Sequence, residues 1–116
     1  MLKNISKETA KTLKKALKKL TKEFSPCEIY LYGSYAKNTW LKTSDLDLII
    51  ISEKFQEKPF LQRLDLVNQI SWKLGEKPHL EIIPLTPKEF KEKLENSTLI
   101  RDTSKHWIKL HPKNQT

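Results

Sequence analysis

The sequence predicts a single α/β (α+β) domain over residues 1–116, with helices packed on a small β-sheet. Segments with the apolar period of a helix alternate along the chain with short runs of β-branched and aromatic residues. The 116 residues are enough for one compact core and too few for two. Apolar residues make up 37% of the chain and charged residues 31%, a balance typical of folded domains rather than of disordered chains.

Helical periodicity first appears over residues 5–24, where Leu13, Leu17 and Leu20 recur at three- and four-residue steps. Pro26 ends this helix, because the residue before a proline is pushed out of the α region. The remaining chain predicts strands over residues 27–32, 45–52 and 79–85, a helical turn and loop over 35–44, helices over 59–74 and 87–95, a short turn over 97–101 and an edge strand over 107–110.

Local signals support the ends of the later elements. Gly75 is a fitting C-terminal stop for the helix over residues 59–74. The run from Thr86 to Glu89 is a capping box with proline at the first helical position. The strand over residues 45–52 begins with polar–apolar alternation and continues as isoleucine, which predicts a strand open at one end and buried at the other.

Cysteine content and hydropathy exclude several classes of protein. The single cysteine, Cys27, excludes a disulfide framework and favours a reducing compartment. The longest unbroken apolar run, over residues 48–51, is far shorter than the roughly 20 residues of a membrane span. Lysines throughout residues 1–22 exclude a secretory apolar core. We therefore expect a cytoplasmic protein with no membrane partner.

The formal net charge of +8 is concentrated near the N-terminus. Residues 1–22 carry eight lysines and one glutamate, whereas residues 23–116 carry fourteen basic and thirteen acidic side chains. The first predicted helix therefore presents a lysine-rich face on a nearly neutral body. A solvated helix face is the simplest explanation. Docking to an acidic partner and weak RNA contact are the alternatives.

Two aspartates, Asp45 and Asp47, stand at the start of the second predicted strand. Residues two apart on a strand point to the same face, with their side chains about 6–7 Å apart along the strand. Like charges at that spacing repel, and a divalent cation would remove the conflict. Carboxylate oxygens suit Mg²⁺ and also Mn²⁺. The alternative is a pair of solvated acids at a strand end.

Three further residues or pairs could belong to the same site. Gly33-Ser34 ends the first predicted strand, where a glycine allows close backbone approach to a phosphate and a serine adds a hydroxyl donor; an ordinary turn is the alternative. Glu81 stands in an apolar strand and would complete a three-carboxylate site if that strand lies beside the second one; an edge-strand glutamate facing water is the alternative. Trp40, in the loop, could stack a base.

These motifs carry a family resemblance. Gly33-Ser34, followed after ten residues by Asp45-Leu46-Asp47-Leu48, resembles the signature of the DNA polymerase beta-type nucleotidyltransferase superfamily. The resemblance covers roughly residues 26–95, and the chain is similar to the minimal nucleotidyltransferases encoded beside HEPN-domain proteins. Lys37-Asn38 departs from the Arg-Gly that often stands there, although Asn38 can replace glycine in a left-handed turn.

The resemblance implies a nucleotidyltransferase fold with a small mixed sheet. It also implies transfer of a nucleoside monophosphate from ATP or another NTP to an acceptor hydroxyl, with pyrophosphate leaving. On this resemblance the catalytic and metal-binding residues are Asp45, Asp47 and Glu81, and the nucleotide-binding residues are Gly33, Ser34, Lys37 and Ser44. The implied cofactor is Mg²⁺, with Mn²⁺ as the alternative.

The acceptor is expected on another protein, because the chain has no residues left for the helical acceptor domain of larger transferases. The resemblance implies a HEPN-type RNase toxin as partner and an antitoxin role for this chain, through adenylylation of the toxin. Two alternatives stay open: a non-catalytic module that neutralises its partner by capping, and a transferase acting on RNA or a small molecule. Homo-oligomerisation also stays open.

Overall fold

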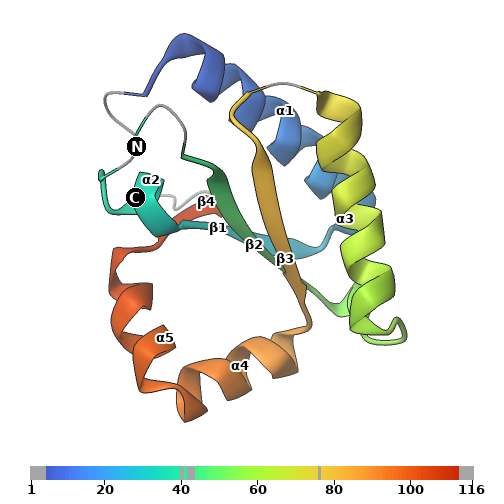
Figure 1. The fold of residues 1–116 in the computed structure, drawn as a ribbon. Helices are drawn as coiled ribbons and strands as arrows, with labels where there is room; N and C mark the ends of the chain where they lie inside the picture. The colour runs from blue at the N-terminus through green and yellow to red at the C-terminus, as the bar shows by residue number, and fades with distance from the viewer. Residues whose placement is uncertain (1–4, 40, 42–43, 76, 113–116) are drawn as a thin grey trace.

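The described residues form one mixed sheet of four strands in the order β3–β2–β1–β4 (Figure 1). The structure is a computed structural model, and it describes residues 5–39, 41, 44–75 and 77–112. The elements are α1 (Lys7–Phe24), β1 (Cys27–Tyr32), α2 (Gly33–Ala36), β2 (Leu46–Ser52), η1 (Glu53–Phe55), α3 (Phe60–Leu74), β3 (Leu80–Leu85), α4 (Pro87–Asn96), α5 (Thr98–Thr103), η2 (Ser104–His106) and β4 (Ile108–His111). β1 pairs antiparallel with β2 and β4, and β2 pairs parallel with β3. The expected α/β class and mixed sheet are confirmed.

Helices cover both faces of this sheet (Figure 1). α1 and α3 lie on one face, where the larger apolar core gathers around Leu31, Leu48 and Ile82. α4 and α5 lie on the other face, where a smaller cluster forms around Ile49 and Leu85. Alternation along β2 produces this division, because neighbouring strand residues point to opposite faces. Both faces are covered over most of the sheet, which explains the isoleucine run in β2.

Capping residues fix several helix ends, and the sequence predicts two of them, at Thr86 and Gly75. Ser6 caps α1 by accepting a hydrogen bond from the backbone N–H of Thr9 at 3.0 Å. The capping box at the start of α4 is complete, with Thr86 and Glu89 bonded reciprocally. Gly75 ends α3 in the left-handed conformation, with φ of 55°.

One helix face differs from the sequence prediction. The apolar spacing of α3 predicts Phe60 in its buried stripe, but Phe60 is 41% exposed and Arg63 is only 5% exposed. Arg63 is buried because its guanidinium donates to the Glu89 carboxylate at 2.5 Å and to the Lys58 carbonyl at 2.8 Å. The two bonds satisfy the buried charge and tie α3 to α4.

The outer face of α3 carries Trp72, which is 86% exposed.

Among the described residues, no helix is both long and apolar enough to cross a membrane. Trp40, which could stack a base, lies outside the described residues.

Candidate active site

Three polar side chains form a row across the sheet at one end of the strands. Register pairs Tyr32 of β1 with Asp47 of β2, and Asp47 with Glu81 of β3. Paired residues share a sheet face, so the row lies on the face that α4 and α5 cover. Glu81 is exposed on the edge strand β3, and Asp47 is half-buried beside it. The expected adjacency of the second and third strands, on which the role of Glu81 depends, is present.

Asp47 has the most perturbed carboxyl group in this row. Four causes together raise its pKa from 3.8 to about 6: burial first, then the hydrogen bond with Glu81, the charge of Glu81 and the charge of Asp45. A hydrogen bond between two carboxyl groups requires a proton on one of them. The same row raises the pKa of Tyr32, first through burial and then through the charges of Asp47 and Glu81. The site therefore concentrates negative charge in a partly desolvated place.

Gly33 brings the backbone close to Asp47. Its φ of 75° is left-handed, and a Cβ at this position would collide with Oδ2 of Asp47 and lie 3.1 Å from its Cγ. Only glycine satisfies both conditions without strain. α2 begins at Gly33, two residues earlier than the predicted helical turn, and Asn38 follows it with φ of 60°. The expectation that Asn38 adopts the left-handed conformation is confirmed.

Ser44 and Asp45 lead into β2. The Ser44 hydroxyl accepts a hydrogen bond from the Leu41 N–H at 2.8 Å, and the Ser44 N–H donates to the Leu41 carbonyl at 2.9 Å. Ser44 thus closes the turn immediately before Asp45. This contact gives Ser44 a positioning role for Asp45, beside the nucleotide-binding role that the sequence predicts. Ser34 and Lys37 both belong to the short segment that begins at Gly33, Ser34 within α2 and Lys37 directly after it.

The carboxylates offer the hard oxygen ligands that Mg²⁺ and Mn²⁺ prefer. Within the described part of the chain, no three His, Cys, Asp or Glu side chains gather closely enough to hold a metal ion. Asp47 and Glu81 are nevertheless in hydrogen-bond contact, and Asp45 is near enough to raise the pKa of Asp47. Mg²⁺ is commonly held by one or two carboxylates together with substrate phosphates. The donor set therefore fits a cation that the substrate helps to bind.

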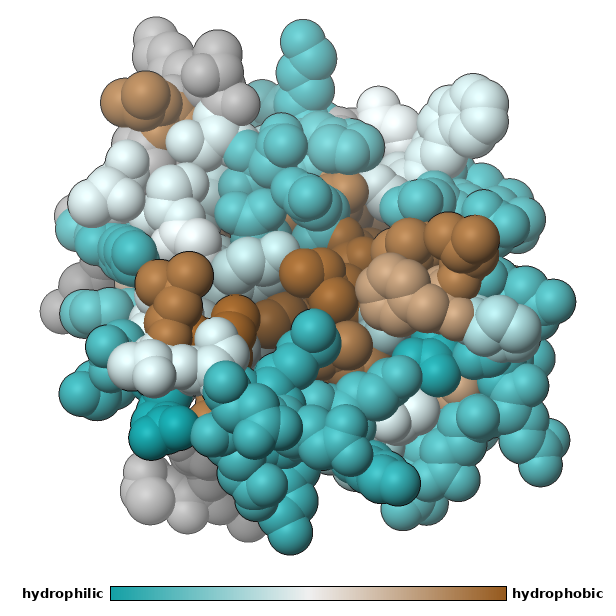
Figure 2. Space-filling model, turned by 60° about the horizontal axis from the view of Figure 1, so that its bottom comes forward, coloured by the Kyte–Doolittle hydropathy of each residue, from teal (hydrophilic) through white to brown (hydrophobic). Residues whose placement is uncertain are grey.

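A cavity of about 330 Å³ opens beside the row, between the sheet and the α4–α5 pair. Figure 2 views the molecule with that side turned forward and shows hydrophobic surface at the centre, bordered by hydrophilic side chains. The cavity is lined by Tyr32, Gly33, Lys37, Ile49, Ile83, Leu85, Phe90, Lys93, Leu99, Ile100, Thr103, His106 and Trp107. It shares Tyr32 and Gly33 with the carboxylate site.

Sequence reasoning missed both Tyr32 and this cavity. Tyr32 stands directly before Gly33-Ser34, and its outward position follows from the alternation of β1, so that signal was available. The cavity carries no local signal, because its walls come from seven separate elements and depend on how α5 folds back over the sheet.

The basic face of α1 lies away from the carboxylates. α1 packs its apolar stripe into the larger core on the opposite sheet face, and its lysines Lys7, Lys11, Lys14, Lys18 and Lys22 are exposed. A ligand bound along these lysines would be separated from Asp47 by the thickness of the sheet. The placement favours a solvated face or a separate docking surface.

Comparisons with known proteins give a consistent picture. The family model of the nucleotidyltransferase domain matches residues 11–110. A crystal structure of a "putative nucleotidyltransferase" from Sulfolobus solfataricus superposes with a TM-score of 0.57 at 21% identity, covering 77% of this chain and 83% of that one. Another "putative nucleotidyltransferase" structure has a TM-score of 0.57 at 28% identity, covering 88% of this chain and 97% of that one. No protein of curated function matches the sequence.

Proposed function

This chain belongs to the nucleotidyltransferase domain family, and we propose that it transfers AMP from ATP to a hydroxyl group on a partner protein. The observation that carries the proposal is the row in which Asp47 and Glu81 stand in register beside Gly33. Two carboxylates and a close backbone approach are what a metal-bound phosphate chain needs. Protein as acceptor, AMP as the transferred group and a HEPN-type toxin as partner remain parts of the proposal.

Each residue of the site has a role in this proposal. Asp45, Asp47 and Glu81 would hold Mg²⁺ or Mn²⁺ together with the substrate phosphates, and the bound cation would neutralise charge on those phosphates in the transition state. Glu81 would accept the proton of the attacking hydroxyl, since it is exposed at the sheet edge where an acceptor can approach. Ser34, Lys37 and the Gly33 backbone would orient the phosphates. Ser44 holds the turn before Asp45.

The test uses the protein with its co-purifying partners, Mg²⁺ and ATP labelled at the α-phosphate. We expect label on a partner protein, lost in Asp47→Asn and in Asp45→Asn and retained in Asp65→Asn, an exposed aspartate on α3. Transfer that survives both active-site changes would overturn the proposal. Label on RNA alone would replace the protein acceptor with an RNA acceptor.

Two observations favour a second candidate, a capping module without catalysis. In the described residues no three metal-ligating side chains converge, and Lys37 replaces the arginine that often stands at its position. A capping module would neutralise its partner at full strength as the Asp47→Asn variant and leave no label with any NTP.

A further inference from the structure

We propose that the cavity between the sheet and α4–α5 binds the nucleoside part of the nucleotide, while the phosphates lie at Gly33 and the carboxylate row. This inference rests on the proposed function and adds to it the place of the base and ribose.

Continuity with the carboxylate row is the first argument. Gly33 lines the cavity, and its α-carbon is so close to Asp47 that a Cβ would collide with Oδ2. Ile49 and Ile83 line the cavity two residues beyond Asp47 and Glu81 on the same strands and the same face. Two residues of a strand span roughly 7 Å. A ribose bridges a gap of that size, so a nucleotide with its α-phosphate at the carboxylates places its base among these isoleucines.

The walls have the chemistry of a base-binding site. Phe90 and Trp107 lie with ring centroids 5.9 Å apart, and Trp107 lies 6.1 Å from Tyr32. Aromatic and aliphatic walls bind a base through stacking and exclusion of water. The volume of about 330 Å³ is at the small end of ligand cavities, which suits a single nucleoside.

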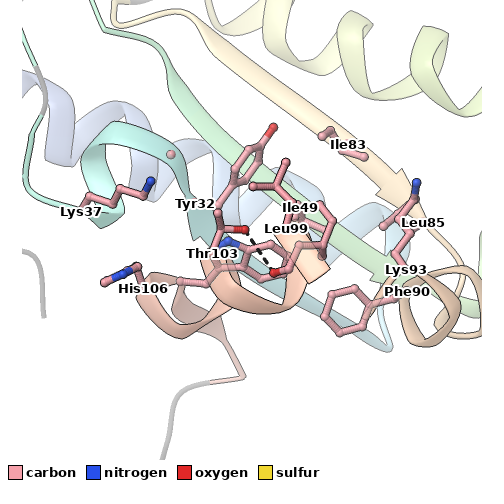
Figure 3. A pocket seen from close by; sticks show the side chains of 13 residues that line it. Tyr32, Lys37, Ile49, Ile83, Leu85, Phe90, Lys93, Leu99, Thr103 and His106 are labelled. Atoms are coloured by element: carbon pink, nitrogen blue, oxygen red, sulfur yellow. Dashed lines mark hydrogen bonds between the residues drawn. The ribbon is translucent and has the colours of Figure 1, made fainter. Parts of the chain in front are cut away.

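One of the two lysines at the cavity suits the phosphate end of the ligand. Lys37 and Lys93 lie at opposite ends of the cavity in Figure 3. Lys37 directly follows α2, the helix that begins at Gly33, and so stands on the phosphate side. The cavity lining contains no acidic side chain, and the Thr103 hydroxyl already donates to the Ile100 carbonyl at 3.1 Å (Figure 3). The lining therefore suits an apolar ring attached to an anion.

The test fills the cavity and compares ATP with tripolyphosphate, which lacks the nucleoside. Thr103→Phe places a large ring inside the lining, and Thr98→Phe places the same ring on the exposed surface of α5 outside it. With Mg²⁺ present, we expect Thr103→Phe to weaken ATP binding at least about tenfold, or about 1.4 kcal/mol, in isothermal titration calorimetry. Its tripolyphosphate affinity and both affinities of Thr98→Phe should stay within about twofold of the wild type.

Unchanged ATP affinity in a folded Thr103→Phe variant would overturn the inference and leave the transfer assay of the proposed function unaffected. A second measurement does not depend on that variant. In the wild-type protein, a bound base should shift the isoleucine methyl resonances of Ile49 and Ile83, whereas tripolyphosphate should not. Ile29, buried on the opposite sheet face, is the internal control. ATP binding that leaves Ile49 and Ile83 unshifted would also overturn the inference.

Discussion

Replacing Asp47 with asparagine tests whether the carboxylate row destabilises the protein when no cation is bound. The pKa of Asp47 is raised from 3.8 to about 6, first by burial and then by Glu81 and Asp45. A carboxyl group with a higher pKa in the folded chain favours folding while it is protonated. This contribution is fully present below pH 3.8 and is lost as the pH rises through about 6.

The size of the effect follows from the same shift. Each tenfold change in proton affinity corresponds to about 1.4 kcal/mol, so the ionised carboxylate lowers the free energy of unfolding by at most about 3 kcal/mol. Asp47 is half-exposed, and solvent screening reduces the expected effect to about 1 kcal/mol. Asparagine keeps the shape of the side chain and removes the charge. We therefore expect Asp47→Asn to be about 1 kcal/mol more stable than the wild type at about pH 8.

Urea unfolding followed by circular dichroism measures this difference, with EDTA present. Well below pH 3.8, where this carboxyl group is protonated in the folded and the unfolded chain alike, the gain should disappear. Added Mg²⁺ should stabilise the wild type by mass action and leave Asp47→Asn unchanged. Asp65→Asn is the matched control and should change stability by less than about 0.5 kcal/mol. An Asp47→Asn protein that is no more stable than the wild type at about pH 8 would refute the electrostatic reasoning.

Three other substitutions have effects on transfer or on stability that follow from the structure. Gly33→Ala should abolish transfer and lower unfolding free energy by about 2 kcal/mol, because its Cβ meets Asp47 in a left-handed backbone; label transfer and urea unfolding check both. Glu89→Gln should lower the free energy of unfolding by about 3 kcal/mol, because the Arg63 guanidinium stays buried without the carboxylate that pairs with it. Trp72→Ser, at an 86% exposed position, should change the free energy of unfolding by less than about 0.5 kcal/mol in urea unfolding.

The Glu89 carboxylate also predicts that the free energy of unfolding falls in acid. Burial opposes its ionisation, but hydrogen bonds from Thr86 and Arg63 outweigh that effect and lower its pKa below 4.5. A lowered pKa contributes stability that is present above 4.5 and is lost as the pH falls through the folded value. The wild type should therefore lose stability on acidification through this range, and Glu89→Gln should lose less. Equal losses in the two proteins would contradict the assignment.

Much of the fold follows from short signals in the sequence. The capping box at Thr86, the left-handed stop at Gly75 and the break at Pro26 each act within a few residues, so they can be read before the chain is folded. Alternation in β2 separates Asp47 from the core-facing leucines in the same local way. These features depend on local backbone geometry, which is why the predicted element ends lie close to those observed.

The exceptions depend on contacts between distant segments. Periodicity assigns Phe60 to the buried stripe of α3, whereas the Glu89 carboxylate, 26 residues from Arg63, draws Arg63 inward instead. The cavity forms because α5 returns over Ile49 and Ile83. No local pattern specifies either arrangement, because each is settled by tertiary packing.

The carboxylate row favours the proposed catalytic role over capping on physical grounds. A capping module needs a complementary surface, and neutral side chains at positions 47 and 81 would serve it without like-charge repulsion. This chain instead keeps Glu81 against the half-buried Asp47, with Asp45 near enough to raise the Asp47 pKa. Gly33 adds a position without a Cβ, which lets the backbone lie close to Asp47. The like-charge contact opposes stability, and both features are explained if a cation and a phosphate chain occupy the site during the reaction.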